Sequence, residues 1–382
     1  MPEPIRIMLA AGGTGGHVFP AIAVADAIRE QAPDTEFLFA GTRDRMEWHA
    51  VPEAGYPISS LWISGFHRRW TLKNALFPLK LLFSIGQSYR MIKRFKPHAV
   101  ISCGGFVAGP PGWVATKRGI PLYLQEQNSF PGVTNRKLAG KAKRIFIAFE
   151  NALKWLPEKK CTITGNPVRK SLVEKAGDPQ AKSKGMAAFE LKPDKPVVLI
   201  MGGSGGARSM NQAMLEQLDV LHDQHKIQII WQCGDTYLRE VKATLFEKGR
   251  SYDKYKNLRL FGFMSNISDA WAAADLVVSR AGATTCAELL ATAKPGILVP
   301  SPWVAGDHQT HNARALQEIG AAQVLKDEEL SAKMTSLIVH ILKDSGIRNR
   351  MEERARKNSP ENAAEKIASV ILSDIRQLQE KN

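Results

Sequence analysis

The sequence lacks three features that would each define a class of protein. Its four cysteines include no C-x-x-C pair, so we expect reduced thiols rather than a disulfide framework or a zinc site. No apolar run is long enough to cross a bilayer, and the first predicted strand begins at Ile5, so no N-terminal signal peptide is expected. No Asp-x-Asp pair occurs, although metal-dependent sugar transferases commonly hold a diphosphate through such a pair and a cation. We therefore expect neither a metal nor a cofactor.

Acidic residues are absent between Glu53 and Glu126, in a chain of 382 residues whose formal net charge is +15. From position 62 to position 96, aromatic residues and leucines alternate with lysine and arginine. An ordinary helix packed on a sheet is one interpretation, because four apolar residues fall at helical spacing: Leu82, Ile85, Tyr89 and Ile92. We favour an interfacial membrane patch, which needs aromatic and aliphatic residues beside basic ones. A nucleic-acid partner is not expected, because the aromatics cluster with leucines instead of spreading along a basic groove.

A glycine-rich turn follows the first predicted strand. The run Gly12-Gly13-Thr14-Gly15-Gly16-His17 separates an apolar stretch at 5–9 from a predicted helix with Pro20 in its first turn. Such a turn brings backbone N–H groups and the positive end of a helix close to an anion, usually a phosphate. The pattern recurs at Gly202-Gly203-Ser204-Gly205-Gly206 after the apolar run 197–201. This recurrence predicts two similar α/β halves that face one cleft.

Apolar runs and helix-like segments alternate through both halves, which predicts parallel sheets covered by helices. The predicted strands are 5–10, 36–40, 99–103, 121–124 and 144–147, then 197–201, 227–232, 258–261, 276–279 and 296–299. A polar, lysine-rich stretch after Asn166-Pro167 separates the halves, and the chain is predicted to be mostly helical after Glu328. We expect one domain over residues 1–168 and another over 169–382, with the last helix able to pack back on the first domain.

Three segments of the first half lie at the carboxyl ends of predicted strands: 12–17, 103–106 and 125–128. Because the sites of parallel sheets form at these ends, we expect the three segments to converge in space. The strand at 36–40 ends in Gly41-Thr42, without the acidic residue that holds the ribose in dinucleotide-binding folds. This absence argues against NAD binding.

The second half contains a further segment suited to a diphosphate. The run Gly282-Ala283-Thr284-Thr285-Cys286-Ala287-Glu288 follows a predicted strand and opens a predicted helix, where N–H and hydroxyl groups are available. Glu288 could accept from ribose hydroxyls, or it could simply complement the helix dipole. Asp307, His308 and His311 follow the next strand, but a third ligand and the usual zinc spacings are absent.

Seven motifs occur in the order found in the MurG family of bacterial glycosyltransferases, and they span nearly the whole chain. They are the glycine runs 12–17 and 202–208, Gly104-Gly105-Phe106-Val107-Ala108-Gly109-Pro110, Glu126-Gln127-Asn128, Gly165-Asn166-Pro167-Val168-Arg169, 282–288 and Asp307-His308-Gln309. The resemblance implies the GT-B fold of two Rossmann-like domains. It also implies inverting, metal-independent transfer of N-acetylglucosamine from UDP-GlcNAc to the muramyl 4-hydroxyl of undecaprenyl-pyrophosphoryl-MurNAc-pentapeptide (lipid I). The product is lipid II, the peptidoglycan precursor.

The same resemblance implies peripheral attachment to the cytoplasmic face of an anionic membrane. A transferase of the same fold that acts on another lipid, such as diacylglycerol, is the alternative, because it would share the donor loops and the membrane patch. Turnover of the two acceptors separates the alternatives.

The resemblance assigns roles to individual residues. The donor contacts that it implies are Thr14, Gly15, Gly16, Asn128, Arg169, Ser204, Met264 (through its backbone), Ala283, Thr284, Thr285, Cys286, Ala287, Glu288 and Gln309. It assigns Gly104, Gly105 and Phe106 to the acceptor. Two positions depart from the family pattern, which has Tyr in place of Phe106 and often His in place of Gln125. A base must take the proton of the acceptor hydroxyl, and His17 and Glu126 are the two candidates.

Overall fold

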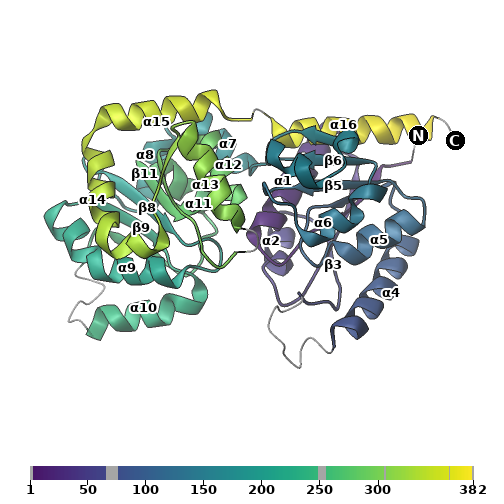
Figure 1. The fold of residues 1–382 in the computed structure, drawn as a ribbon, viewed down its shortest axis with the longest axis horizontal. Helices are drawn as coiled ribbons and strands as arrows, with labels where there is room; N and C mark the ends of the chain where they lie inside the picture. The colour runs from purple at the N-terminus through teal and green to yellow at the C-terminus, as the bar shows by residue number, and fades with distance from the viewer. Residues whose placement is uncertain (1–2, 66–75, 248–254, 305–306, 361, 381–382) are drawn as a thin grey trace. The chain divides into compact units, whose positions relative to one another are not determined.

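The computed structural model describes residues 3–65, 76–247, 255–304, 307–360 and 362–380. It divides the chain into two compact units (Figure 1). The first unit comprises Met1–Arg169 and Pro360–Asn382, and the second comprises Lys170–Ser359. This division differs from the ranges expected from the sequence mainly in the last helix, which belongs to the first unit.

The first unit is built on a parallel seven-stranded sheet in the order β3-β2-β1-β4-β5-β6-β7. Its strands are β1 (Arg6–Ala10), β2 (Glu36–Gly41), β3 (Ile58–Ser60), β4 (Ala99–Ser102), β5 (Leu122–Glu126), β6 (Arg144–Ile147) and β7 (Cys161–Ile163). Its α-helices are α1 (Gly15–Gln31), α2 (Glu47–Glu53), α4 (Phe77–Phe95), α5 (Gly109–Lys117), α6 (Val133–Leu138) and α16 (Ala363–Gln379). Strands β4 and β5 are buried along their whole length. Each begins with three apolar residues, 99–101 and 122–124, and ends in buried polar ones: Ser102 in β4, Gln125 and Glu126 in β5.

The last helix, α16, packs against α1 and contributes Ile367, Ile371 and Ile375 to the core of the first unit (Figure 1). Its buried Asp374 accepts hydrogen bonds from Arg144 Nε at 2.8 Å and from the Tyr123 hydroxyl at 3.2 Å. Burial alone would raise the pKa of Asp374, but the hydrogen bond from Arg144 and the nearby positive charges outweigh it and lower that pKa. The ion pair therefore fixes the chain end to the sheet.

The second unit contains a parallel six-stranded sheet in the order β10-β9-β8-β11-β12-β13. Its strands are β8 (Val197–Met201), β9 (Gln228–Gln232), β10 (Leu258–Phe261), β11 (Leu276–Arg280), β12 (Gly296–Val299) and β13 (Ala322–Val324). Its α-helices are α7 (Lys170–Gly177), α8 (Ala181–Ala188), α9 (Arg208–Asp219), α10 (Asp235–Glu247), α11 (Ile267–Ala273), α12 (Ala283–Thr292), α13 (His308–Glu318), α14 (Leu330–Lys343) and α15 (Ser345–Lys357). The ten strands predicted from the sequence are confirmed in both sheets, each within two residues at either end.

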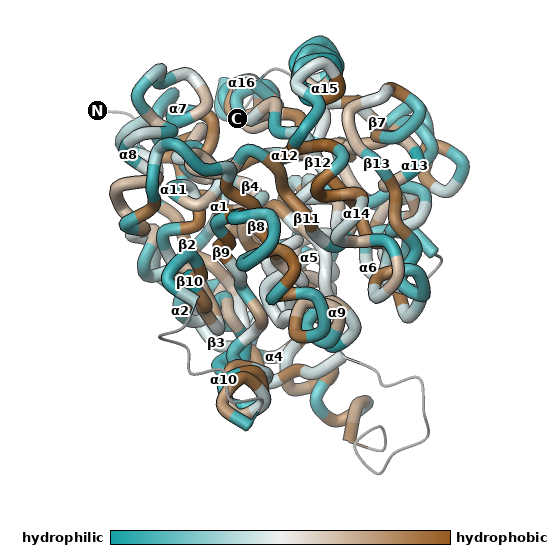
Figure 2. Tube along the Cα trace, turned by 90° about the vertical axis from the view of Figure 1, so that its left-hand side faces the viewer, coloured by the Kyte–Doolittle hydropathy of each residue, from teal (hydrophilic) through white to brown (hydrophobic). Residues whose placement is uncertain are grey.

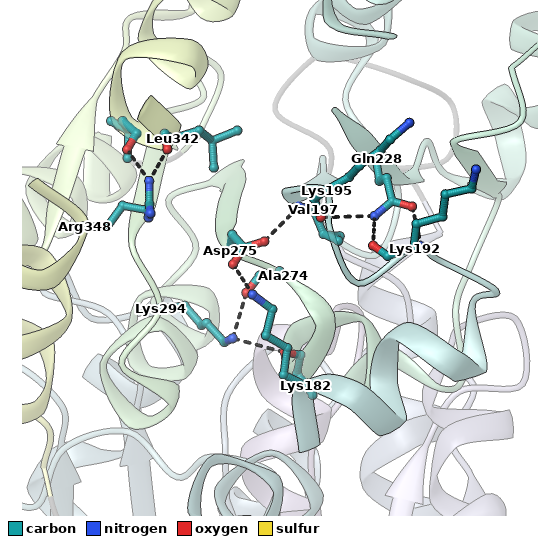
Figure 3. Close-up of polar contacts among 12 residues, drawn as sticks. Lys182, Lys192, Lys195, Val197, Gln228, Ala274, Asp275, Lys294, Leu342 and Arg348 are labelled. Atoms are coloured by element: carbon teal, nitrogen blue, oxygen red, sulfur yellow. Dashed lines mark hydrogen bonds and ion pairs between the residues drawn. The ribbon is translucent and has the colours of Figure 1, made fainter. Parts of the chain in front are cut away.

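Polar side chains form hydrogen bonds at the amino ends of the strands of the second sheet (Figure 3). Asp275 pairs with Lys182 and accepts from the Val197 N–H at 2.9 Å. Lys294 Nζ donates to the carbonyls of Ala274 at 2.7 Å and Ala272 at 3.2 Å, which lie at the end of α11. Burial lowers the pKa of Lys294 from 10.5 to about 8. This amino edge of the sheet lies opposite the carboxyl ends of the strands, where the candidate donor loops are found.

Candidate active site

The first glycine loop joins β1 to α1 and depends on a buried carboxylate. Gly13 adopts φ +89°, a conformation open to glycine but strained for other residues, and its N–H donates to Glu47 Oε2 at 3.1 Å. A Cβ added to Gly12 would lie 2.5 Å from Glu47 Oε1, so any larger residue at this position would clash with the carboxylate. Thr14 is the N-cap of α1, is exposed, and makes no capping hydrogen bond with its side chain.

Glu47 itself was not singled out by the sequence, because a lone glutamate at the start of a short helix looks like an ordinary surface residue. It is fully buried, and its Oε1 accepts from the Thr42 N–H at 3.1 Å and the Thr42 hydroxyl at 2.8 Å. Its two oxygens therefore tie the first glycine loop to the end of β2.

The three segments expected to converge in the first unit do so around His17. His17 Nδ1 lies 3.0 Å from Gln127 Oε1, and Gln127 Nε2 donates to the Cys103 carbonyl at 2.6 Å. These residues follow β1, β5 and β4, which are neighbours in the sheet. Cys103 is fully buried, and burial raises the pKa of its thiol to about 12, which disfavours the reactive thiolate form. His17 is partly exposed.

The second base candidate, Glu126, has a different environment. Its side chain is buried. Its Oε1 accepts hydrogen bonds from the Asn128 N–H at 3.0 Å and from the Asn128 side-chain amide at 3.2 Å. Its Oε2 accepts from the Gly132 N–H at 3.0 Å and from the Asn135 side-chain amide at 2.9 Å. Four donors thus surround the carboxylate, and they hold the loop between β5 and α6. The Asn128 amide, predicted to bind the donor, is oriented by the same carboxylate.

The residues assigned to the acceptor pack around the first glycine loop. Gly104 and Gly105 both have positive φ, +94° and +78°, and a Cβ on Gly105 would lie 2.3 Å from the Gly12 carbonyl oxygen. The Phe106 ring lies against Gly13, because a Cβ there would be 3.2 Å from Phe106 Cε1. Phe106, which stands where the family pattern has Tyr, therefore contacts the loop directly.

Arg169, which immediately precedes the second unit in the chain, has its guanidinium 4.3 Å from the centre of the Phe19 ring. Phe19 belongs to the first turns of α1, so the cation–π contact holds the arginine near the amino end of that helix. The residues predicted to bind the donor are therefore divided between the units, with Thr14, Gly15, Gly16, Asn128 and Arg169 in the first.

The second glycine loop joins β8 to α9 and packs against the end of β9. Gly206 has φ +74°, and a Cβ there would lie 1.9 Å from the Cys233 carbonyl oxygen, so only glycine fits. Ser204 is exposed at the tip of the loop. Gln232, which the sequence did not single out, donates to the Gly203 carbonyl at 3.1 Å and accepts from the Met264 N–H at 3.0 Å. The Gln232 side chain thus connects two segments predicted to bind UDP-GlcNAc. Its oxygen already accepts the hydrogen bond that the backbone N–H of Met264 can donate.

Helix α12 begins at Ala283, with Gly282 as its N-cap. Cys286 and Glu288 are both buried, with Glu288 only 2% exposed, and burial raises the pKa of the Cys286 thiol to about 12. Gln309, at the start of α13, accepts from the Ser301 N–H at 2.8 Å, which orients its amide. Within the described ranges, no three His, Cys, Asp or Glu side chains lie close enough together to hold a metal ion. This applies also to Asp307, His308 and His311.

Helix α4 carries the predicted membrane patch of the first unit. It exposes Leu82 (68%) and Phe83 (55%), while its buried residues are Ser84, Ser88 and Ile92. Of the four residues at helical spacing, Ile92 is buried and Ile85 packs against the same core cluster, as an ordinary packed helix requires, whereas Leu82 and Tyr89 are exposed. Figure 2 shows hydrophobic residues, in brown, on helix α4. Arg68, Arg69 and Lys73, expected to join the patch, lie in the segment 66–75, outside the described residues. None of the helices described is long and apolar enough to span a membrane.

Two parallel α/β units, each with a glycine loop at the carboxyl edge of its sheet, define the GT-B class of glycosyltransferase folds. A solved structure of MurG from Acinetobacter baumannii matches with a TM-score of 0.69 and 29% identity, covering 97% of this chain and 100% of that one. The S. aureus MnaA–UDP structure matches with a TM-score of 0.70 over 98% of this chain and 97% of that one; at 16% identity it bears on the fold alone.

The chain belongs to glycosyltransferase family 28. The model of the family's N-terminal domain matches residues 7–147, and that of its C-terminal domain matches residues 197–371. Two curated relatives carry the name UDP-N-acetylglucosamine–N-acetylmuramyl-(pentapeptide) pyrophosphoryl-undecaprenol N-acetylglucosamine transferase. The one from Salinibacter ruber is 42% identical over 368 residues, 96% of each chain. The one from Bacteroides thetaiotaomicron is 40% identical over 372 residues, 97% of this chain and 98% of that one.

Proposed function

We propose that this chain transfers N-acetylglucosamine from UDP-GlcNAc to the muramyl 4-hydroxyl of lipid I, giving lipid II for peptidoglycan synthesis. The observation that carries the proposal is 42% identity, over 96% of both chains, to a transferase whose name states this donor and this acceptor. The two glycine loops support it, because each leads into a helix start where backbone amides suit phosphate groups.

In this reaction the acceptor hydroxyl attacks the anomeric carbon on the side opposite to UDP, so the configuration inverts. A base takes the hydroxyl proton, and we assign that role to His17. Glu126 is the poorer candidate because four N–H donors already occupy its two oxygens, and these hydrogen bonds hold the loop between β5 and α6. Glu126 instead positions Asn128.

The departing diphosphate needs positive charge or hydrogen-bond donors as the bond to the sugar breaks. We assign this role to the amino end of α12, at Ala283, Thr284 and Thr285, and to Arg169. Ser204, Met264, Glu288 and Gln309 complete the proposed donor contacts in the second unit. The reaction runs without a metal or cofactor in this proposal, because the chain contains no Asp-x-Asp pair to hold a cation.

We further propose that the first unit binds the cytoplasmic face of an anionic membrane peripherally, through the surface of α4. Leu79, Leu82 and Phe83 of this helix are exposed, whereas Ile92 on another side of it is buried in the core of the first unit, so the helix both packs on the sheet and presents apolar side chains outward. Lys80 lies 5.8 Å from the centre of the Trp62 ring and places a positive charge beside the exposed aromatics. Apolar insertion and attraction to anionic headgroups act together on such a surface.

Acceptor choice tests the proposed function. Labelled UDP-GlcNAc is supplied together with equal amounts of lipid I and diacylglycerol in the same detergent micelles. The proposal predicts label in the lipid I product and none in a glycolipid of diacylglycerol. Label on diacylglycerol alone would establish the alternative transferase.

A further inference from the structure

The orientation of the Gln127 amide is determined by its partners. Gln127 is buried, and its Nε2 donates to the Cys103 carbonyl at 2.6 Å and to the side-chain oxygen of Gln125. A backbone carbonyl can only accept hydrogen bonds. Turning the amide over would therefore place two acceptor oxygens 2.6 Å apart, so Gln127 Oε1 must be the atom that faces His17.

That orientation determines which nitrogen of His17 carries hydrogen. His17 Nδ1 lies 3.0 Å from Gln127 Oε1, and an amide oxygen cannot donate. The imidazole must therefore donate through Nδ1–H. A neutral imidazole carries only one N–H, so Nε2 is left with its lone pair.

Two further features keep this arrangement in place. Gln125 Nε2 donates to Asn166 Oδ1 at 3.1 Å, so the chain of amides continues from His17 through Gln127 and Gln125 to Asn166. Gly104 leaves space for the contact, because a Cβ there would lie 2.9 Å from His17 Nδ1. The chain of amides contains no charged group, so it orients the ring without the carboxylate that often accompanies a catalytic histidine.

We propose that Gln127 is a positioning residue that holds His17 in its Nδ1–H tautomer and so makes Nε2 the atom that accepts the acceptor's proton. The catalytic meaning of this inference rests on the proposed function, whereas the tautomer itself does not. Gln125, at the position where the family pattern often has His, supports Gln127 by accepting from it and donating onward.

The tautomer can be measured directly in the full chain without substrate. Long-range ¹H–¹⁵N spectra of protein labelled at histidine, recorded at a pH where imidazole is neutral, distinguish a protonated ring nitrogen from an unprotonated one. His17 is assigned by its loss in His17→Gln. We expect a protonated Nδ1 and an unprotonated Nε2. A wild-type His17 protonated at Nε2 would overturn the inference, and this result needs no folded variant.

Gln127→Met keeps the length of the side chain but removes the acceptor. We expect its His17 signals to move toward the other tautomer, and its kcat for lipid I to fall about five- to tenfold while the KM for UDP-GlcNAc changes little. Gln228→Met, at a buried glutamine on the amino edge of the second sheet, is the matched control and should leave the His17 signals unchanged. Unaltered His17 signals in Gln127→Met would contradict the inference. Absence of any transfer by the wild type, with the expected tautomer, would contradict only the proposed function.

Discussion

Glu47 accepts a hydrogen bond from the N–H of Gly13 at 3.1 Å, although the two residues are 34 positions apart and Glu47 is completely buried. The same carboxylate accepts two hydrogen bonds from Thr42. Because Gly12 has no room for a Cβ beside Glu47, the loop and the carboxylate fit each other closely. The first glycine loop is therefore held by a side chain from another helix as well as by its own backbone.

We expect Glu47→Ala to destabilise the first unit by about 2–4 kcal/mol, because it leaves buried donors unsatisfied. Glu47→Gln should lose less, since it keeps one acceptor oxygen. The matched control is Glu53→Ala, at an exposed carboxylate of the same helix, α2. Thermal unfolding followed by circular dichroism measures the effect, and a Tm of Glu47→Ala equal to that of Glu53→Ala would show that the carboxylate does not hold the loop.

The lowered pKa of Lys294 predicts a pH dependence of stability. Burial brings this pKa from 10.5 to about 8, so between these values the unfolded chain binds more protons than the folded one. The free energy of unfolding therefore rises with pH in this window. Below the window, the cost of burying the charged Lys294 lowers this free energy by its full amount. Above the window, Lys294 is neutral in both states and has no such cost. Relative to Lys294→Met, the wild type should gain at most about 3 kcal/mol across the window. Denaturant titrations over a pH series test this, and a difference that stays constant or falls would contradict it.

Removing apolar side chains from α4 should weaken membrane binding. We expect Leu79→Ser with Phe83→Ser to lower binding to anionic vesicles by about tenfold, because each side chain loses part of its transfer free energy into the bilayer interface. Phe246→Ser is the matched control, because Phe246 is more exposed than either but lies on α10 of the second unit. Vesicle sedimentation at two salt concentrations measures binding. Equal loss in the control, or no loss in the double variant, would argue against this surface.

Glu288→Gln tests the proposed donor site with minimal change of shape. Loss of a charge-assisted hydrogen bond to the ribose is worth roughly 1.5–3 kcal/mol, so kcat/KM for UDP-GlcNAc should fall by about tenfold or more. Since Glu288 is buried, Tm is measured in parallel, and the isosteric amide should leave it nearly unchanged. Glu318→Gln, at the exposed end of α13, is the control. Unchanged kinetics in Glu288→Gln would remove this residue from the donor site.

The strands were predictable because parallel strands buried on both faces leave uninterrupted apolar runs in the sequence, as in 197–201. The short edge strands Ile58–Ser60 and Ala322–Val324 were not predicted. Three residues are too few to show a hydrophobic pattern. Pairing with a neighbouring strand therefore decides the conformation of these two segments.

Glycine and loop sequences marked the segments that the structure brings together around His17, namely 12–17, 103–106 and 125–128. The polar side chains that hold those loops were not predictable, because nothing local distinguishes Glu47 or Gln232 from surface residues. Their roles depend on contacts with residues about thirty positions away or more, such as Gln232 with Met264. Similarly, the sequence could not show that both oxygens of Glu126 accept hydrogen bonds from its own loop and from Asn135.

The chemical structure of the product tests the proposed transfer. UDP-GlcNAc and lipid I are incubated with the protein in excess EDTA, and the product is examined by mass spectrometry and NMR. We expect one added N-acetylglucosamine, joined in the β configuration to the muramyl 4-hydroxyl, with undiminished yield in EDTA. Absence of this product, retention of the α configuration, or transfer that requires an added divalent cation would contradict the proposal.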